Sequence, residues 1–283
     1  MTVLVTGATG NVGSAVVNEL SNRGVAVRAF VRDADAELPD SVEVAVGDLD
    51  DPASIRDALD GVDRVFLSTG DGPRKVEQEV AVIDNAGGVD LLLKASTVGA
   101  KAGSPLKPFD WHGRVEEHLR HSGVPYVVLG SGFYMTNLLA AAEPVRTQGI
   151  LSAPAGAGRV AMIDPRDIGT VAAAVLCGSG HEGRTYRLTG PEAITYAEIA
   201  AILEVQYVDI PPSAAREHLE AAGMPDWLVD HLDRAFGLIR AGSFEDTTDS
   251  VRVLTGREPR SFAQFARDHA DAFTRAPATN RSG

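Results

Sequence analysis

The chain has 283 residues, of which 44% are hydrophobic, and its formal net charge is -13 at pH 7. This length allows one large domain or a main domain with a smaller lobe, and the negative charge argues against nucleic acid as a partner. Because no apolar run approaches the roughly 18 residues of a membrane-spanning helix and no charged signal segment precedes the first strand, we expect a cytoplasmic protein without a membrane partner.

The N-terminal residues predict a dinucleotide-binding turn. Residues 2–6 form a short apolar strand, residues 7–13 have the spacing Gly-x-x-Gly-x-x-Gly, and a helix follows over 12–22. Such a turn brings backbone N–H groups and a helix N-terminus to one point, which suits a pyrophosphate, and glycine lets the backbone approach it closely. A tight turn without a ligand is the alternative. The predicted cofactor contacts here are Gly7, Thr9, Gly10, Asn11 and Val12.

Strands and helices alternate over the first 130 residues. The further strands are predicted at 26–31, 42–46, 64–68, 91–95 and 126–129, and the helices between them at 53–59, 76–86 and 111–121. Apolar strands separated by helices indicate a parallel sheet that is covered on both faces. We therefore predict an α/β fold with a Rossmann-type doubly wound sheet, whose ligand lies at the carboxyl ends of the strands.

The end of the second strand indicates which dinucleotide is bound. An NAD-preferring site has an acidic residue about 20 positions after the glycines, whereas here Arg28 and Arg32 precede the first acid, Asp33. A guanidinium matches a 2′-phosphate through charge-assisted bonds, so we predict NADP(H) in preference to NAD(H). The alternative is that Arg32 is a solvated surface charge neutralised by Asp33.

The ends of the next strands supply further predicted cofactor contacts. Asp48 can accept a hydrogen bond from the adenine amino group while Leu49 packs on the ring. Alternatively, Asp48 caps the helix after Pro52, although Asp50 and Asp51 are better placed to do so. The contacts predicted for the central and nicotinamide parts of the cofactor are Ser68, Thr69, Gly70, Ala95, Ser96 and Thr97.

After about residue 133 the alternation is lost. Strands are predicted at 160–163 and 185–188, and helices at 168–177, 196–203, 213–222, 227–241 and 262–273. We predict a Rossmann domain over 1–132, a smaller α+β lobe over 133–274 that covers the substrate and interleaves with the sheet, and a flexible tail over 275–283. The only cysteine, Cys177, excludes an intrachain disulfide, and the apolar run before it predicts a buried structural thiol.

Taken together, these motifs resemble the atypical NmrA-like branch of the short-chain dehydrogenase/reductase superfamily. The similar segments are 6–13, 47–49, 112–126, 133–137, 164–169 and 188–192. The resemblance implies an NAD(P)-binding protein similar to quinone oxidoreductases, with a cofactor contact at Phe133. The family has Leu-Arg where this chain has Leu129-Gly130, which leaves that arginine contact without a counterpart here.

The catalytic residues differ from those of standard superfamily members. These use Tyr-x-x-x-Lys, but Asp71, Asp90, Thr97 and Gly103 stand four residues before the four lysines. In the family's atypical reductases one helical slot holds a lysine or a histidine, and here it is His112. In the first turn of its helix the macrodipole favours a neutral imidazole, which can orient a carbonyl or relay a proton. We predict His112 as catalytic, with Ser96 and Thr97 as hydrogen-bond donors; alternatively, it caps its helix or bonds to Asp110.

Two functions remain open from these residues. The first is an NADP(H)-dependent oxidoreductase that reduces a small-molecule substrate, an aromatic carbonyl or quinone. With a planar quinone, little proton-transfer machinery is needed. The second is an NADP(H)-binding redox sensor without turnover. A sugar-nucleotide epimerase is disfavoured because those relatives usually keep the Tyr-Lys dyad.

The residues predicted to line the substrate space are Phe109, Trp111, Tyr134 and Asn137, although packing is the alternative for each. The other histidines show no ligand spacing, so we predict no metal.

Overall fold

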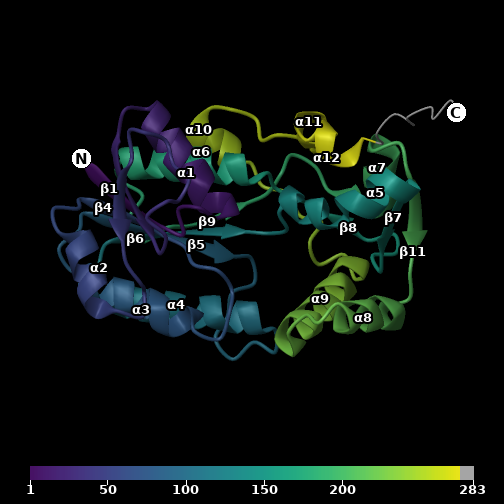
Figure 1. The fold of residues 1–283 in the computed structure, drawn as a ribbon, viewed down its shortest axis with the longest axis horizontal. Coiled ribbons are helices and arrows are strands. Elements are labelled where there is room, and N and C mark those ends of the chain that lie inside the picture. The colour runs from purple at the N-terminus through teal and green to yellow at the C-terminus, as the bar shows by residue number, and fades with distance from the viewer. Residues whose placement is uncertain (275–283) are drawn as a thin grey trace, which may run out of the picture. The chain divides into compact units, whose positions relative to one another are not determined.

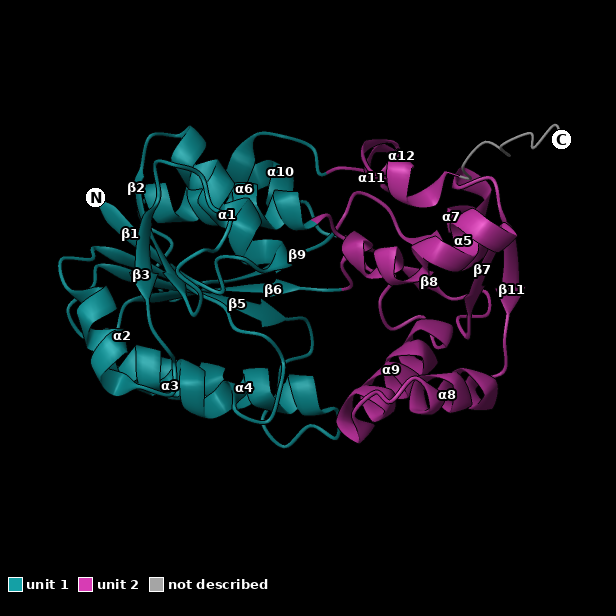
Figure 2. Ribbon diagram, in the orientation of Figure 1, with its two compact units in different colours: residues 1–132, 165–189, 248–259 teal, residues 133–164, 190–247, 260–283 magenta. Residues whose placement is uncertain are grey.

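The computed structural model describes residues 1–274, which form two compact units (Figure 2). The first unit contains residues 1–132, 165–189 and 248–259, and the second contains 133–164, 190–247 and the chain from residue 260 onward. Two segments that follow residue 132 therefore belong to the first unit. The tail that the sequence predicts to be flexible, 275–283, lies outside the described residues.

The first unit is built on a seven-stranded sheet in which every neighbouring pair is parallel (Figure 1). In order across the sheet, the strands are β3 (Glu43–Val46), β2 (Ala26–Val31), β1 (Thr2–Thr6), β4 (Arg64–Leu67), β5 (Leu91–Thr97), β6 (Tyr126–Ser131) and β9 (Thr185–Leu188). One face carries α1 (Asn11–Asn22), α6 (Pro165–Cys177) and α10 (Ser250–Thr255), and the other carries α2 (Pro52–Leu59), α3 (Lys75–Asn85) and α4 (Lys107–His121). The predicted doubly wound α/β fold is confirmed.

Close backbone contacts hold the helices of the first unit in place. A Cβ atom at Gly13 would lie 2.0 Å from the carbonyl oxygen of Gly7, so only glycine lets α1 start this near the turn. At Gly169, on α6, a Cβ atom would lie 2.7 Å from the carbonyl carbon of Ala15 on α1. Because both positions exclude a side chain, α1 is fixed between the strand ends and α6.

The second unit combines short helices with two small sheets. In one of these, β7 (Ile150–Ala153) pairs with β11 (Gln206–Asp209) in parallel, and in the other, β8 (Arg159–Val160) pairs with β10 (Ile194–Thr195) in antiparallel orientation. The elements are η1 (Met135–Ala141), α5 (Ala142–Gln148), β7 (Ile150–Ala153), β8 (Arg159–Val160), β10 (Ile194–Thr195), α7 (Tyr196–Ile202), β11 (Gln206–Asp209), α8 (Pro212–Ala221), α9 (Asp226–Arg240), α11 (Phe262–Asp268) and α12 (Ala270–Phe273).

Several sequence predictions need correction. The helix expected over 262–273 is two helices, because the backbone leaves the helical region at His269 (φ -115°, ψ 28°). The strand expected over 160–163 is limited to Arg159–Val160. Cys177 is exposed, not buried, since it is the last residue of α6 and follows the last buried residue of that helix, Leu176. Within residues 1–274, no helix combines the length and the apolar character needed to cross a bilayer.

Candidate functional site

The turn after β1 exposes bare backbone at the start of α1. Thr6 fixes the strand end, because its hydroxyl donates to the Ser68 carbonyl (2.8 Å) and accepts from the Ser68 N–H (2.9 Å). Gly7 has φ +61°, and a Cβ there would lie 2.7 Å from the Ser68 oxygen. Gly10 precedes α1 without a side-chain cap, so the first helical N–H groups, such as that of Val12, face the turn. This geometry fits a pyrophosphate. Thr9 and Asn11, also predicted contacts, are exposed beside it.

The two arginines near the end of β2 differ in what they bind. Arg28 is already engaged, since it pairs with Glu43 (2.8 Å) and donates to the carbonyls of residues 58 and 60. Arg32 is exposed and takes part in no ion pair with any of the residues described. Asp33 accepts a hydrogen bond from the backbone N–H of Asp35 (3.0 Å) and does not neutralise Arg32. Arg32 is therefore the guanidinium with free bonding capacity for a phosphate.

The segment after β3 leads into α2, and Asp51, not Asp48, caps this helix. Asp51 is the N-cap of α2 and accepts from Ala53 N–H (2.9 Å), so that alternative for Asp48 is wrong. Asp48 Oδ1 instead accepts from the N–H of Asp50 (2.9 Å), and Leu49 is half-buried. Their predicted role at the adenine stays a prediction.

Five ionisable side chains close into a ring of polar contacts beside the ends of β4 and β5. Going round this ionic ring, Asp71 Oδ1 lies 3.3 Å from Lys75 Nζ, which lies 3.2 Å from Glu79 Oε1. Glu79 Oε2 lies 3.1 Å from Lys94 Nζ, and Lys94 Nζ lies 3.2 Å from His112 Nδ1. His112 Nε2 lies 3.6 Å from Asp71 Oδ1, which closes the ring.

The ionic ring is buried except at one member. Side-chain exposure is 2% for Lys75, 0% for Glu79 and Lys94, and 11% for His112, against 42% for Asp71. Buried charges are costly unless they are paired and hydrogen-bonded, and here each ammonium has several partners. Lys94 forms an ion pair with Glu79 and contacts His112 Nδ1 and the carbonyl of Ala95. Lys75 forms ion pairs with Asp71 and Glu79 and contacts both the carbonyl and the hydroxyl of Thr69.

The ring shifts the pKa values of its members. Burial lowers the pKa of Lys94 to about 8 although the Glu79 charge opposes this, and burial together with the Lys94 charge lowers the pKa of His112 to about 4. Burial alone would raise the pKa of Asp71 and Glu79, but their cationic and hydrogen-bonding partners hold both well below their usual values. Close to pH 7, His112 is therefore neutral and the carboxylates are charged.

The neutral state of His112 has a different cause from the one expected. The sequence placed it in the first helical turn, but α4 begins at Lys107, so burial and Lys94 account for its low pKa and not the helix dipole. The alternative that His112 bonds to Asp110 is also wrong, because Asp110 accepts from Gly103 N–H (2.7 Å) and His112 contacts Asp71 and Lys94.

The predicted hydroxyl donors are engaged to different extents. Ser96 is buried and donates its one proton to Glu116 (2.5 Å), which also accepts from Arg120 (2.7 Å). Thr69 donates to Glu79 (2.8 Å). Thr97 is half-buried and, among the residues described, its hydroxyl makes one long contact (3.4 Å), to the next carbonyl. The hydroxyls of Thr97 and of the half-buried Ser68 thus have capacity for a ligand, while Gly70 and Ala95 present backbone near these strand ends.

The predicted substrate residues lie in both units. Trp111 is buried, and Phe109 covers Gly99, where a Cβ would lie 2.8 Å from the ring. Phe133, Tyr134 and Asn137 belong to the second unit; the Phe133 ring stacks edge-on against Phe244 at 5.1 Å, Tyr134 precedes η1, and Asn137 is exposed. Their substrate and cofactor roles stay predictions.

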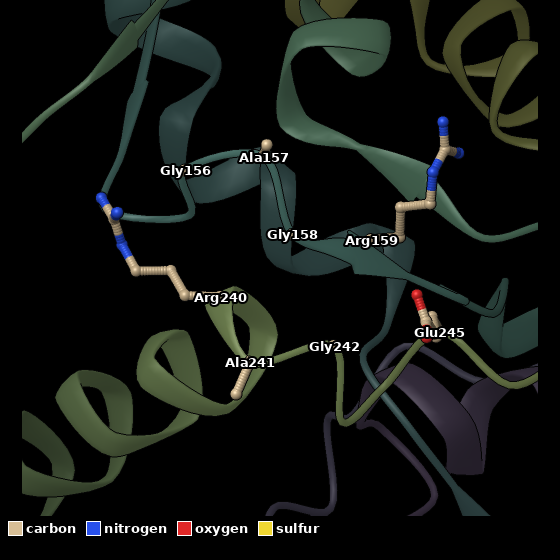
Figure 3. A pocket seen from close by; sticks show the side chains of 8 residues that line it. All are labelled: Gly156, Ala157, Gly158, Arg159, Arg240, Ala241, Gly242 and Glu245. Atoms are coloured by element: carbon tan, nitrogen blue, oxygen red, sulfur yellow. The ribbon is translucent and has the colours of Figure 1, made fainter.

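A hollow of about 370 Å³ in the second unit contains two arginines (Figure 3). Their side chains extend in different directions, and each is engaged: Arg159 with Glu198 (2.9 Å) and Arg240 with Asp209 (2.5 Å). Because these guanidinium groups are neutralised, the hollow is not a candidate anion site.

Four residues of the ionic ring were not predicted as site residues: Asp71, Lys75, Glu79 and Lys94. Charged residues inside otherwise apolar segments could have indicated them. Lys94 interrupts the apolar strand 91–95, and Lys75 and Glu79 share the buried face of α3 with Val76 and Ile83.

Comparison with known proteins gives consistent similarities. The family model described as "NmrA-like family" matches residues 1–253. The chain is 37% identical to "NAD(P)H azoreductase" of Xenophilus azovorans, over 96% of this chain and 99% of that protein. It is 32% identical to "Quinone oxidoreductase 2" of Escherichia coli strain K12, over 89% and 93%. The crystal structure of the NADPH-dependent quinone oxidoreductase QOR2 of E. coli complexed with NADPH superposes with a TM-score of 0.83 at 30% identity, covering 94% of this chain and 99% of that one.

Proposed function

The chain belongs to the NmrA-like family, and from this premise we propose that it is an NADP(H)-dependent oxidoreductase that reduces a small aromatic carbonyl or quinone by hydride transfer. The observation that carries the proposal is the buried imidazole of His112, which contacts Lys94 and Asp71 in the same unit as the glycine turn. Relatives named as an azoreductase and a quinone oxidoreductase support it, because both names describe reduction of conjugated acceptors.

The residues of the first unit fit a nicotinamide dinucleotide. The turn from Gly7 to Val12 would hold the pyrophosphate through backbone N–H groups, and Arg32 would hold the 2′-phosphate that distinguishes NADP(H). When bound, NADPH supplies the hydride. The protein's own contribution is to orient the acceptor and to supply hydrogen bonds and a proton.

His112 and Thr97 are the groups proposed to act on the acceptor. A neutral imidazole with a proton on one nitrogen donates a hydrogen bond to the oxygen on which charge develops. Thr97 adds a second donor. Ser96 is left out of the proposal, because its hydroxyl already donates its hydrogen bond to Glu116.

The second candidate is an NADP(H)-binding redox sensor, which the absence of a Tyr-x-x-x-Lys dyad favours. A panel experiment separates the two. We expect NADPH oxidation with benzoquinones and naphthoquinones, and slower oxidation with azo dyes and aromatic ketones. Tight NADPH binding without turnover of any acceptor would favour the sensor, and absence of NADPH binding would overturn both.

Cofactor preference is expected to depend on Arg32. Because the substitution Arg32→Ala removes charge-assisted bonds to the 2′-phosphate, we expect the Kd for NADPH to rise about 10–100-fold while the Kd for NADH changes less than about twofold. Isothermal titration calorimetry measures both. Arg23→Ala is the matched control, since Arg23 is paired with Glu19 at the far end of α1. Equal weakening of both cofactors by Arg32→Ala would contradict the assignment.

A further inference from the structure

The ionic ring permits only one tautomer of His112. At neutral pH the Lys94 ammonium has hydrogen-bond donors and no acceptor, so it is the donor in every hydrogen bond that it makes. It forms an ion pair with Glu79 Oε2, and its hydrogen-bond partners are the Ala95 carbonyl and His112 Nδ1. Nδ1 is therefore the acceptor, and the imidazole proton lies on Nε2, on the side of the Asp71 carboxylate.

The charges of the ionic ring favour a neutral His112. Lys75 and Lys94 contribute two positive charges, and Asp71 and Glu79 contribute two negative ones, so the ring is balanced while His112 is neutral. A proton added to His112 would leave one uncompensated positive charge among side chains that are almost fully buried. The low pKa of His112, caused first by burial and then by the Lys94 charge, agrees with this balance.

We propose that Lys94 and Glu79 are positioning residues: Lys94 fixes the Nε2–H tautomer of His112, and Glu79 holds the Lys94 ammonium in place. This inference rests on the proposed function for its link to turnover, but not for its structural content. Nε2–H, which lies 3.6 Å from Asp71 Oδ1, is then the single donor of His112, and it keeps its proton over the whole neutral pH range.

Apart from Lys94 and Asp71, the charged groups described near His112 do not form hydrogen bonds with its imidazole. From α3 and the loop before it, the facing groups are Asp71, Lys75 and Glu79, and from β5 the facing group is Lys94. On α4 itself, the neighbouring carboxylates are engaged elsewhere: Asp110 accepts from Gly103 N–H, and Glu116 accepts from Ser96 and Arg120. The tautomer is thus set by Lys94 and Asp71 together.

The test is ¹⁵N NMR of the histidine side chains in the full-length protein, with the His112 signals assigned by their loss in His112→Gln. In the native protein we expect a pure Nε2–H signal that does not titrate between about pH 5 and 8. His118 is the internal control, since it lies on the same helix, is 38% exposed and pairs with Asp84 (2.6 Å).

Two variants remove the positioning contact. Lys94→Met deletes the donor but leaves one Glu79 oxygen without its cation, so the neutral pair Glu79→Gln/Lys94→Met is measured as well. In both we expect mixed tautomers and a His112 titration midpoint raised by at least about one pH unit toward 6.5, with His118 unchanged. An unchanged tautomer and midpoint in a folded variant would overturn the proposal.

The pH profile of turnover gives a second readout. Native kcat is expected to be flat down to about pH 5, whereas kcat of the double variant is expected to change with pH at the raised midpoint that NMR gives for its His112, where the imidazole takes up a second proton. A protein that turns over no acceptor would refute the proposed function, but the NMR signals would still decide whether Lys94 sets the tautomer.

Discussion

Replacing Glu79 by glutamine is expected to lower the free energy of unfolding at pH 7 by about 3–5 kcal/mol, because it removes one charge from a buried network and leaves its partners uncompensated. Glu79 is completely buried between Lys75 and Lys94, and glutamine keeps its shape. The measurement is urea unfolding followed by circular dichroism. Glu77→Gln is the control, since Glu77 is exposed on the same helix, and its effect is expected within about 0.5 kcal/mol.

The loss in Glu79→Gln is also expected to shrink as the pH rises. Without Glu79 the charge partner that raises the pKa of Lys94 is gone, so this pKa falls below its native value of about 8. The unfolded chain, with a lysine pKa near 10.4, then binds more protons than the folded one over the intervening range, and stability increases with pH there. A loss that is equal at pH 6 and pH 9 would show that Lys94 is not the uncompensated charge.

The fold of the first unit follows closely from local sequence patterns. Apolar strands such as Val3–Val5 and the glycine spacing at 7–13 each predict their structure within a few residues. The second unit is less predictable, because β8 and β10 are two-residue strands that pair across a long stretch of chain. Short strands of this kind are defined by their partners, which periodicity cannot identify.

The candidate site also has features that the sequence predicts and contacts that it does not. The glycine turn and Arg32 were predicted from local motifs, and His112 from the family resemblance; their roles stay predictions. The contacts of His112 could not be predicted, since Lys94 and Asp71 come from other elements that meet only in the folded sheet. A lysine inside an apolar strand does signal a buried, paired charge, but the sequence does not tell which carboxylate pairs with it.

Turnover is expected to depend on His112 while cofactor binding does not. His112→Ala removes the proposed donor, and a general acid or base typically contributes about 10²–10⁴-fold to the rate, so kcat with a quinone should fall by at least about 100-fold. The Kd for NADPH should stay within about twofold, because the glycine turn and Arg32 are untouched. Stopped-flow assays and calorimetry on the same preparation measure the two quantities.

Two further variants make this result specific. His112→Gln keeps a side chain that can accept from Lys94 and donate toward Asp71, so it preserves the ionic ring but cannot transfer a proton as an imidazole does. If its kcat falls as far as that of His112→Ala, proton transfer is the lost property; if it keeps most of the native rate, hydrogen bonding alone suffices. His118→Ala should leave kcat unchanged, since His118 pairs with Asp84. Native turnover in both His112 variants would exclude the imidazole from the reaction.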